Sequence, residues 1–247
     1  MSNLYNSLAE LYEAMYKTFI DYEEEFNLYK QLLLIHQCRS VVEIGCGTGN
    51  LAGRFIEQGF YYTGLDISAE MLAIAKRNNP ACNFLQTSMQ DFMLPRQLDA
   101  AIITGRTISY LLTNKEVMDC LSAIHKNLKA PGIVCFDFID ANAFIPLIKN
   151  DAVLHKAVIG HKKCVRESFW KINLNQSWAF DWHSIFYEET KDGSLHKIGE
   201  DNSTIRAFTK DEIILFLQLA GFEIKEIFAR KVYAFDTYVV VAEANGQ

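Results

Sequence analysis

The hydrophobic pattern of the chain changes most sharply between residues 41 and 56. Val41–Ile44 is a short run that is apolar except for Glu43, as in a buried strand. Glycines at alternate positions then interrupt the run, and apolar residues return at helical spacing over 51–56. A strand, a glycine turn and a helix in this order predict the first unit of a doubly wound α/β fold. Such folds bind ligands at the carboxyl ends of their strands, where this turn lies.

Helical and strand patterns alternate along much of the remaining chain. Tyr5, Leu8 and Tyr12 follow helical spacing within residues 5–36, which predicts an amphipathic helix. Ser68 is expected to cap a later helix, and two capping boxes predict further helix starts. The capping boxes are Thr113–Glu116 and Thr209–Glu212, and the expected strands are 41–44, 61–68, 81–86, 99–104, 133–138, 223–232 and 237–244.

These elements predict a seven-stranded, mostly parallel and doubly wound sheet. After about residue 142 the pattern changes to segments rich in aromatic and β-branched residues, with turn signals at 173–176 and 191–193. We expect a short helix pair at 141–156, and after it an antiparallel sheet of about three strands. The chain is therefore expected to form a main unit, residues 1–142 plus 208–247, with an inserted antiparallel β cap, residues 143–207.

Composition narrows the functional classes. The chain has 247 residues, 50% of them hydrophobic, so one α/β domain with a large insertion, or two small domains, can bury a substantial core. The net charge of −6 at pH 7 disfavours a nucleic-acid-binding surface. No apolar run approaches the roughly 18 residues of a membrane span, and the polar N-terminus does not resemble a secretory signal. We expect no nucleic-acid partner and no membrane association.

The 6 cysteines are scattered along the chain, and none forms a C-x-x-C pair. This predicts reduced, mostly buried thiols and a cytoplasmic protein. His155, His161 and Cys164 lie near one another in sequence, but their spacing matches no zinc-binding pattern. The sequence therefore predicts no metal site.

Two ligand types compete for the glycine turn. A dinucleotide fingerprint, G-x-G-x-x-G, would need a glycine where Asn50 stands. Glu43, just before the turn, suits a ligand with a cationic amino group better than a pyrophosphate. Asp66 ends the next strand, where an acid can accept hydrogen bonds from both ribose hydroxyls. A nicotinamide-dependent oxidoreductase on a similar fold stays open as an alternative.

Several of these segments together resemble the class I S-adenosylmethionine-dependent methyltransferases. The resemblance covers roughly residues 4–138, and the C-terminal strand pair more loosely. It implies a Rossmann-like fold with a reversed terminal strand, S-adenosylmethionine as cofactor, and methyl transfer to a small-molecule acceptor, with an amine foremost. The matching segments are EIGCGTGN, LDIS, SMQDF, AAIIT and LKAPGIVCFDF, and YNSLAELYEAMYKTFIDY resembles the N-terminal helix of small-molecule methyltransferases, including amino-sugar N-methyltransferases.

The resemblance also implies which residues form the site. Ser88 stands where relatives often carry an acid for the adenine amino group, so the adenine contact is expected to fall to Met89, with Asp91 nearby. Tyr12 is expected to align the acceptor or shield the sulfonium. His183 is the candidate general base, because its strand is expected to face the cofactor. The expected cofactor-binding residues are Tyr22, Glu43, Gly45, Cys46, Gly47, Gly49, Asp66, Ile67, Met71, Ser88, Met89 and Thr104.

Other interpretations of these residues stay open. Tyr12 and Tyr22 would serve only packing if their stripe is simply a buried helix face, and His183 would then be a surface residue of the cap. The loop after residue 104 would form either the active-site wall, with Arg106, Thr107, Ser109 and Tyr110, or a solvated turn, and Asp137 and Asp140 would face the substrate or cap a turn.

The cap is expected to govern the choice of acceptor. Its aromatic residues exceed what a thin sheet needs for its own core, so they would line a substrate pocket, or pack on the main unit or on the second subunit of a homodimer. A non-catalytic module that binds the cofactor, and a protein methyltransferase with an open groove, are further alternatives. The aromatic residues are Phe169, Trp170, Trp178, Phe180 and Trp182.

Overall fold

The computed structural model describes residues 3–149, 151–175, 178–232 and 235–246, and in them the chain forms two sheets. The larger sheet has seven strands in the order β10-β11-β5-β4-β1-β2-β3. Its first five strands in sequence are parallel, whereas β11 runs antiparallel to both β5 and β10. This confirms the mostly parallel sheet with a reversed terminal strand. The strands are β1 (Ser40–Ile44), β2 (Tyr61–Asp66), β3 (Asn83–Gln86), β4 (Leu98–Ile103), β5 (Leu128–Ile139), β10 (Phe222–Val232) and β11 (Phe235–Ala244).

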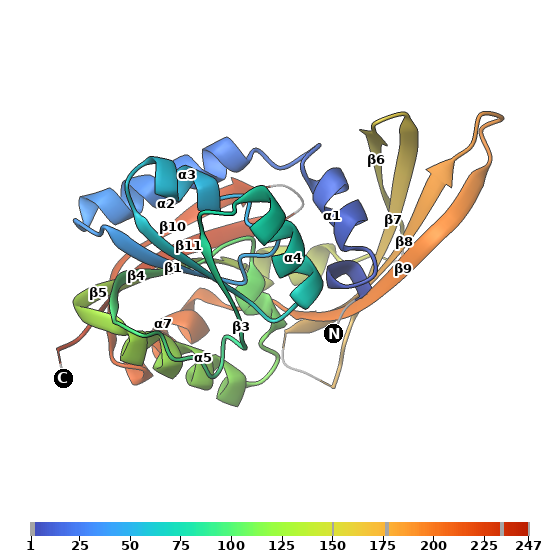
Figure 1. Ribbon diagram of the computed structural model, residues 1–247. Coiled ribbons are helices and arrows are strands. Elements are labelled where there is room, and N and C mark those ends of the chain that lie inside the picture. The colour runs from blue at the N-terminus through green and yellow to red at the C-terminus, as the bar shows by residue number, and fades with distance from the viewer. Residues whose placement is uncertain (1–2, 150, 176–177, 233–234, 247) are drawn as a thin grey trace.

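Helices cover both faces of this sheet (Figure 1). On one face, α2 (Tyr22–Ile35), α3 (Ala52–Glu57) and α4 (Ala69–Asn78) pack on the sheet through a cluster that includes Tyr29 and Phe55. On the other face, α5 (Asn114–Asn127) and α7 (Lys210–Leu219) pack through a second cluster. Both expected capping boxes are present, at the starts of α5 and α7, and Ser68 caps α4. The fold is doubly wound, as the sequence predicts.

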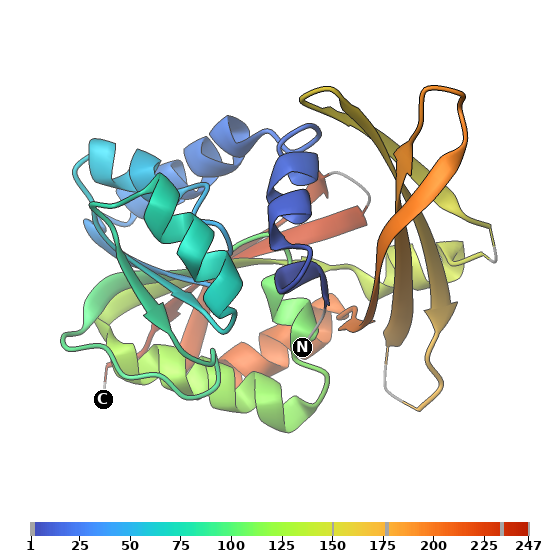
Figure 2. The same cartoon turned by 45° about the vertical axis from the view of Figure 1, so that its right-hand side comes forward.

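The N-terminal segment differs from the single helix expected over residues 5–36. After η1 (Asn3–Tyr5), it forms α1 (Ala9–Tyr16) and α2, separated by a break. Asp21 makes the break favourable, because its side chain accepts hydrogen bonds of 3.0 Å from the backbone N–H groups of Glu23 and Glu24 and so starts a new helix. Figure 2 shows α1 between the larger sheet with its helices and the cap.

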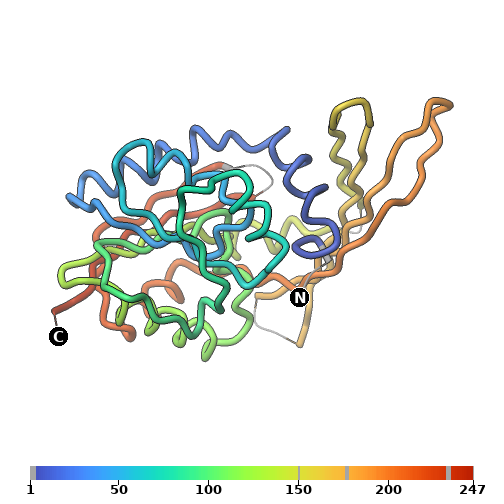
Figure 3. The backbone as a smooth tube through the Cα atoms, viewed as in Figure 1, coloured from blue at the N-terminus to red at the C-terminus, as the bar shows by residue number. Residues whose placement is uncertain are grey.

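The cap is a four-stranded antiparallel sheet in the order β6-β7-β8-β9, one strand more than expected. The expected helix pair shortens to α6 (Ala141–Phe144) and η3 (Ile145–Leu147), because the following residues form the extra strand β6. The two hairpins extend away from the larger sheet (Figure 3). The turn expected at 173–176 lies partly outside the described residues, and the division into two domains stays a prediction. The cap strands are β6 (Val153–Ile159), β7 (Lys162–Ile172), β8 (Ala179–Glu189) and β9 (Leu195–Arg206).

Parallel pairing brings the carboxyl ends of the central strands to one edge of the sheet. In register, Glu43 of β1 lies beside Gly64 of β2 and Ile102 of β4. The residues that follow these strands therefore meet at this edge, together with α1 and the base of the cap. None of the helices in the described ranges has the length and apolar character needed to cross a membrane.

Candidate active site

A cavity of about 440 Å³ lies at this edge of the sheet. Its wall combines the glycine turn after β1, the ends of β2, β4 and β5, aromatic residues of α1 and the start of α2, and Trp182 and Ile205 of the cap. The predicted residues that line it are Tyr12, Tyr22, Glu43, Gly45, Cys46, Gly47, Asp66, Ile67, Met71, Ser88, Met89 and Thr104.

The glycine turn needs its glycines for two different reasons. Gly45 has a φ of +71°, and a Cβ added there would lie 2.3 Å from Cγ2 of Thr107, so the loop after β4 packs directly on the turn. Gly47 has a φ of +53°, and a Cβ added there would meet nothing within 4 Å. The backbone of Gly47 is therefore open to the cavity and accessible to a ligand.

Gly49 does not belong to the cavity wall, contrary to the prediction. A Cβ at this position would lie 3.1 Å from Cβ of Ala75 and 3.2 Å from the ring of Phe84. The third glycine therefore lets α4 and β3 pack closely on the turn, on the side away from the cavity.

Asp66 is fixed at the end of β2 by backbone donors. Its Oδ2 accepts a hydrogen bond from the N–H of Gly47 at 2.8 Å, and its Oδ1 accepts one from the N–H of Ser68 at 2.8 Å. Burial raises the pKa of the Asp66 carboxyl, and these hydrogen bonds oppose the shift. The carboxyl is thereby held at the mouth of the glycine turn.

Glu43 is almost completely buried beneath the turn, with 2% of its surface exposed. Its Oε2 accepts a hydrogen bond from the Tyr62 hydroxyl at 2.6 Å, and its Oε1 accepts one from Oγ1 of Thr104 at 3.0 Å. Burial raises the pKa of Glu43 to about 7 despite these bonds. A cationic ligand nearby would therefore stabilise the ionised form of this carboxyl.

Tyrosines of the N-terminal segment form one wall of the cavity. The ring of Tyr12 stacks on that of Tyr16 at 4.0 Å between centroids and contacts Tyr5 edge-on at 5.5 Å. The hydroxyls of Tyr5 and Tyr110 lie 2.5 Å apart, which joins this wall to the loop after β4. Burial raises the pKa values of Tyr5 and Tyr12, so these phenols are neutral.

His183 does not line the cavity, contrary to the expectation that its strand presents it to the cofactor. Its ring lies beside Phe169, and its Nε2 is 3.6 Å from Oε2 of Glu200, with 39% of the side chain exposed. Side chains alternate along a strand, so the neighbouring Trp182 faces the cavity instead, with its ring 6.0 Å from that of Phe235. The geometry gives no support for His183 as a base.

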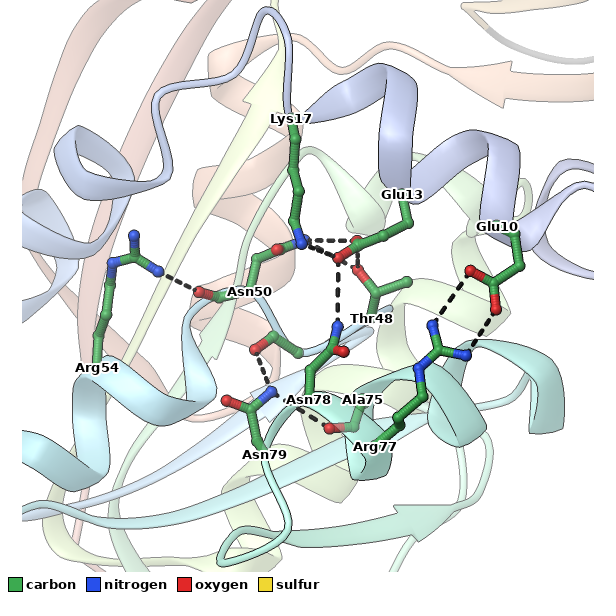
Figure 4. Close-up of polar contacts among 11 residues, drawn as sticks. Glu10, Glu13, Lys17, Thr48, Asn50, Arg54, Ala75, Arg77, Asn78 and Asn79 are labelled. Carbon is green, nitrogen blue, oxygen red and sulfur yellow. Dashed lines mark hydrogen bonds and ion pairs between the residues drawn. The ribbon is translucent and has the colours of Figure 1, made fainter. Parts of the chain in front are cut away.

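Glu13 is a buried residue of the site that the sequence analysis did not single out (Figure 4). Its carboxylate accepts hydrogen bonds from the Thr48 hydroxyl, from Asn50 at 3.1 Å and from Asn78 at 3.4 Å, and forms an ion pair with Lys17. These bonds attach α1 to the glycine turn and to the end of α4. No pattern in the sequence connects residue 13 with residue 48, so the structure alone reveals this contact.

The loop after β4 brings a positive charge to the cavity. Arg106 has a φ of +63°, its N–H donates to Oδ1 of Asp137 at 2.8 Å, and its guanidinium lies 5.0 Å from the ring of Phe235. Within the described part of the chain, Arg106 is the only Lys, Arg or His on the cavity wall, whereas Glu25, Glu43, Asp66, Glu116 and Asp137 all line it.

This set of groups fits a ribose-containing ligand that carries positive charge. A carboxylate at the end of β2 can accept from a diol, and the excess of acids suits an ammonium or a sulfonium. Trp182 Nε1 and Ser109 Oγ are buried and have no hydrogen-bond partner among the described residues, as expected where a ligand completes the site. The same residues contain no group of His, Cys, Asp and Glu side chains that could hold a metal ion.

Comparisons with known proteins define the class. Residues 41–132 match the family model described as a methyltransferase domain. A putative methyltransferase of Geobacillus sp. is 28% identical over 196 residues, which span 77% of this chain and 76% of that protein. The dTDP-3-amino-3,4,6-trideoxy-alpha-D-glucopyranose N,N-dimethyltransferase of Streptomyces venezuelae is 28% identical over 98 residues, which span 40% of this chain and 41% of that protein.

The fold agrees with this class. The S-adenosylmethionine-bound amino pentose methyltransferase CalS10 from Micromonospora echinaspora superposes with a TM-score of 0.81 at 18% identity, covering 95% of this chain and 97% of that one. The protein is an S-adenosylmethionine-dependent methyltransferase, and residues 41–132 are the part that matches the methyltransferase-domain model. The class decides against the nicotinamide-dependent alternative, and the relatives of the chain include methyltransferases of small sugar molecules.

Proposed function

We propose that the protein transfers the methyl group of S-adenosylmethionine to an amine on a small polar molecule, with an amino sugar foremost. The observation that carries the proposal is the acidic cavity with aromatic walls, which is covered by α1 and extended by the cap. Relatives whose names specify amino-sugar N,N-dimethylation support the choice of an amine.

In this proposal the main unit holds the cofactor, which supplies a methyl group activated by a sulfonium. Asp66 accepts hydrogen bonds from the ribose hydroxyls, and Glu43 balances the positive charge at the methionine end. Ser88 and Met89 contact the adenine. The remaining positions would shape the pocket around these contacts, and they are Tyr22, Gly45, Cys46, Gly47, Ile67, Met71 and Thr104.

The chain would promote the reaction mainly by alignment and by exclusion of water. Tyr12 and Tyr16 form an aromatic wall that can position the acceptor, and alignment alone supplies up to about 7–11 kcal/mol. Only a neutral amine can attack a methyl group. A partly apolar cavity lowers the pKa of a bound amine because it disfavours the ammonium.

Trp182 and Ile205 would give the cap its influence over acceptor choice, because both line the cavity. Among the other cap aromatics, Phe169 lies beside His183, on the opposite face of the strand pair from Trp182. Trp170 and Phe180 pack with Phe144 and Phe235 against the main unit, which leaves the homodimer a prediction of the sequence alone.

A panel of amines and alcohols tests the proposal. The protein is incubated with S-adenosylmethionine and each compound, amino sugars included, and S-adenosylhomocysteine and methylated products are measured by mass spectrometry. We expect N-methylated products, and less product with the Asp66→Ala variant when S-adenosylmethionine is not saturating. Methylation of alcohols alone would contradict the proposal that the acceptor is an amine. Methylation of added protein alone would favour the alternative of a protein methyltransferase.

A further inference from the structure

Asp137 is the carboxyl of the cavity wall whose hydrogen bonding is least complete. It lies near the end of β5, next to the loop after β4, and 2% of its surface is exposed. Its Oδ1 accepts the hydrogen bond from the N–H of Arg106, and no described residue donates to its Oδ2. This side chain therefore combines a fixed orientation with one oxygen available to a ligand.

The other acids of the cavity are already engaged. Glu43 and Asp66 each accept hydrogen bonds on both oxygens. Glu25 uses both oxygens to bind Arg230, at 3.0 and 2.9 Å. Glu116 belongs to the capping box of α5. Among the acids of the cavity, Asp137 is thus the carboxyl best placed to accept a further hydrogen bond.

Asp137 also lines the same cavity as the glycine turn, and the loop after β4 contacts both. The loop that contacts Asp137 through Arg106 packs on the glycine turn through Thr107, whose Cγ2 is 2.3 Å from the Cβ position of Gly45. The carboxyl therefore faces the cavity that would hold the cofactor, next to the loop that packs on the glycine turn. Phe235 and Trp182, at the base of the cap, line the same cavity.

We propose that Asp137 accepts the proton that the acceptor amine releases during methyl transfer. The lone pair of the nitrogen forms the new N–CH₃ bond, and the electron pair of the broken S–CH₃ bond stays on sulfur. The proton leaves the nitrogen for Oδ2 of Asp137, and its N–H electron pair stays on nitrogen. The inference rests on the proposed function, because it needs an acceptor that carries a proton on its nucleophile.

The charged surroundings of Asp137 favour this role. Burial raises its pKa to about 6, and the like charge of Glu25 on α2 adds to the shift. Arg106 and, on β10, Arg230 oppose it, and the buried Tyr29 hydroxyl of α2 also lies within electrostatic range. The carboxyl is therefore ionised at neutral pH and basic enough to hold a proton transiently.

Asp137→Asn tests the proposal, because an asparagine keeps the shape and the acceptor for Arg106 but cannot take a proton. Asp140→Asn is the matched control, since Asp140 caps α6 through the N–H of Asn142 at 3.0 Å and does not line the cavity. With the best amine of the panel, we expect kcat to fall about 100-fold or more in Asp137→Asn and to stay at the wild-type level in Asp140→Asn. The affinity for S-adenosylhomocysteine, measured by calorimetry, should remain within about threefold in both variants.

The pH profile separates this role from a structural one. Wild-type kcat should fall as the pH drops through about 6, because Asp137 becomes protonated, and Asp137→Asn should lack this limb. Asp137→Glu should recover part of the rate. An Asp137→Asn variant with wild-type kcat and an unchanged acid limb would overturn the proposal.

Two further experiments distinguish a failure of the proposed function from a failure of the proposed role of Asp137. If only an alcohol of the panel is methylated, the amine assignment fails, and the same variants measured with that alcohol still decide whether Asp137 takes the proton. Carbon-13 NMR of the protein with S-adenosylhomocysteine bound, labelled at the aspartate carboxyls and assigned with Asp137→Asn, needs no acceptor. We expect a titration near pH 6, and a carboxyl that stays protonated to pH 8 would overturn the proposal.

Discussion

The carboxylate of Asp66 is held in position by backbone N–H groups, including that of Gly47, before a ligand binds. Each carboxylate oxygen of Asp66 already accepts a backbone hydrogen bond, so the ribose would add to a preformed arrangement. A charge-assisted hydrogen bond contributes about 1.5–3 kcal/mol, so Asp66→Ala should weaken S-adenosylhomocysteine binding about tenfold to a hundredfold in calorimetry. Asp119→Ala is the control, because Asp119 forms an exposed ion pair with Lys115. Unchanged affinity in a folded Asp66→Ala variant would remove Asp66 from the site.

Gly45 allows a comparison of crowding with backbone strain. Gly45 and Gly193 both have positive φ, +71° and +85°, but only Gly45 has a neighbour where a Cβ would go. An alanine at either position should cost about 1–2 kcal/mol for the backbone, and Gly45→Ala about 1–3 kcal/mol more for the clash with Thr107. Urea denaturation measures both free energies of unfolding. Equal losses would show that the loop after β4 yields to the added methyl group.

At single residues, the sequence predicted the acids and most of the turn because the strand–turn–helix order dictates their place. Glu43, Gly45, Gly47 and Asp66 all lie at the cavity. Gly49 was wrongly placed on the cavity wall because glycine serves close packing as readily as ligand approach. His183 was wrongly placed there because side chains alternate between the two faces of a strand, and the sequence does not show which face meets the cavity.

At the scale of elements, Glu13 is the buried acid that attaches α1 to the glycine turn. Glu13 receives hydrogen bonds from Thr48, Asn50 and Asn78, whereas Glu10, one turn earlier, forms an exposed ion pair with Arg77 (Figure 4). Glu13→Ala should therefore speed amide hydrogen exchange in residues 9–16 roughly tenfold or more and weaken S-adenosylhomocysteine binding. Glu10→Ala should leave both nearly unchanged. Equal exchange in the two variants would show that aromatic packing alone holds α1.

The elements also show which structural features a local sequence pattern predicts and which it does not. The capping boxes of α5 and α7 were predictable because the signal is local and the two hydrogen bonds form within one turn. The start of β6, residues 153–156, was expected to be helical because β6 is an edge strand with mostly exposed side chains, so little burial marks its period. The break between α1 and α2 has a local signal in the Asp21 cap, but the packing of α1 toward the cap, through Met15 with Phe186, depends on distant residues.

At the scale of the whole molecule, the sheet topology follows from the order of strands and helices, but the joining of cap and main unit does not. Arg206, buried at the end of β9, donates to the carbonyl of Leu112 at 3.3 Å, to Asn114 at 2.9 Å and to Glu212 at 3.0 Å. It thereby connects the base of the cap to α5 and α7. These partners are distant in sequence, so their contact becomes visible only in three dimensions.

At the same scale, the affinity for the cofactor should depend on pH through the ionisation of Glu43. The pKa of Glu43 is raised from 4.5 to about 7 by burial. The unliganded protein therefore loses stability as the pH rises through this window, because the carboxyl ionises in the unfolded chain while the buried carboxyl keeps its proton. A ligand ammonium held near Glu43 favours the ionised form and releases its proton. The dissociation constant of S-adenosylhomocysteine should therefore fall as the pH rises toward about 7, by up to about tenfold per unit, and then level off.

Calorimetry across this range, in buffers of different ionisation enthalpy, measures both the affinity and the protons released. Glu43→Gln should bind with little dependence on pH, because the amide does not titrate. Glu10→Gln, which changes an exposed acid outside the cavity, should keep the wild-type profile. A wild-type affinity that stays constant from about pH 5.5 to 8.5 would show that the bound ligand leaves the charge of Glu43 unchanged, and that another group balances the methionine end.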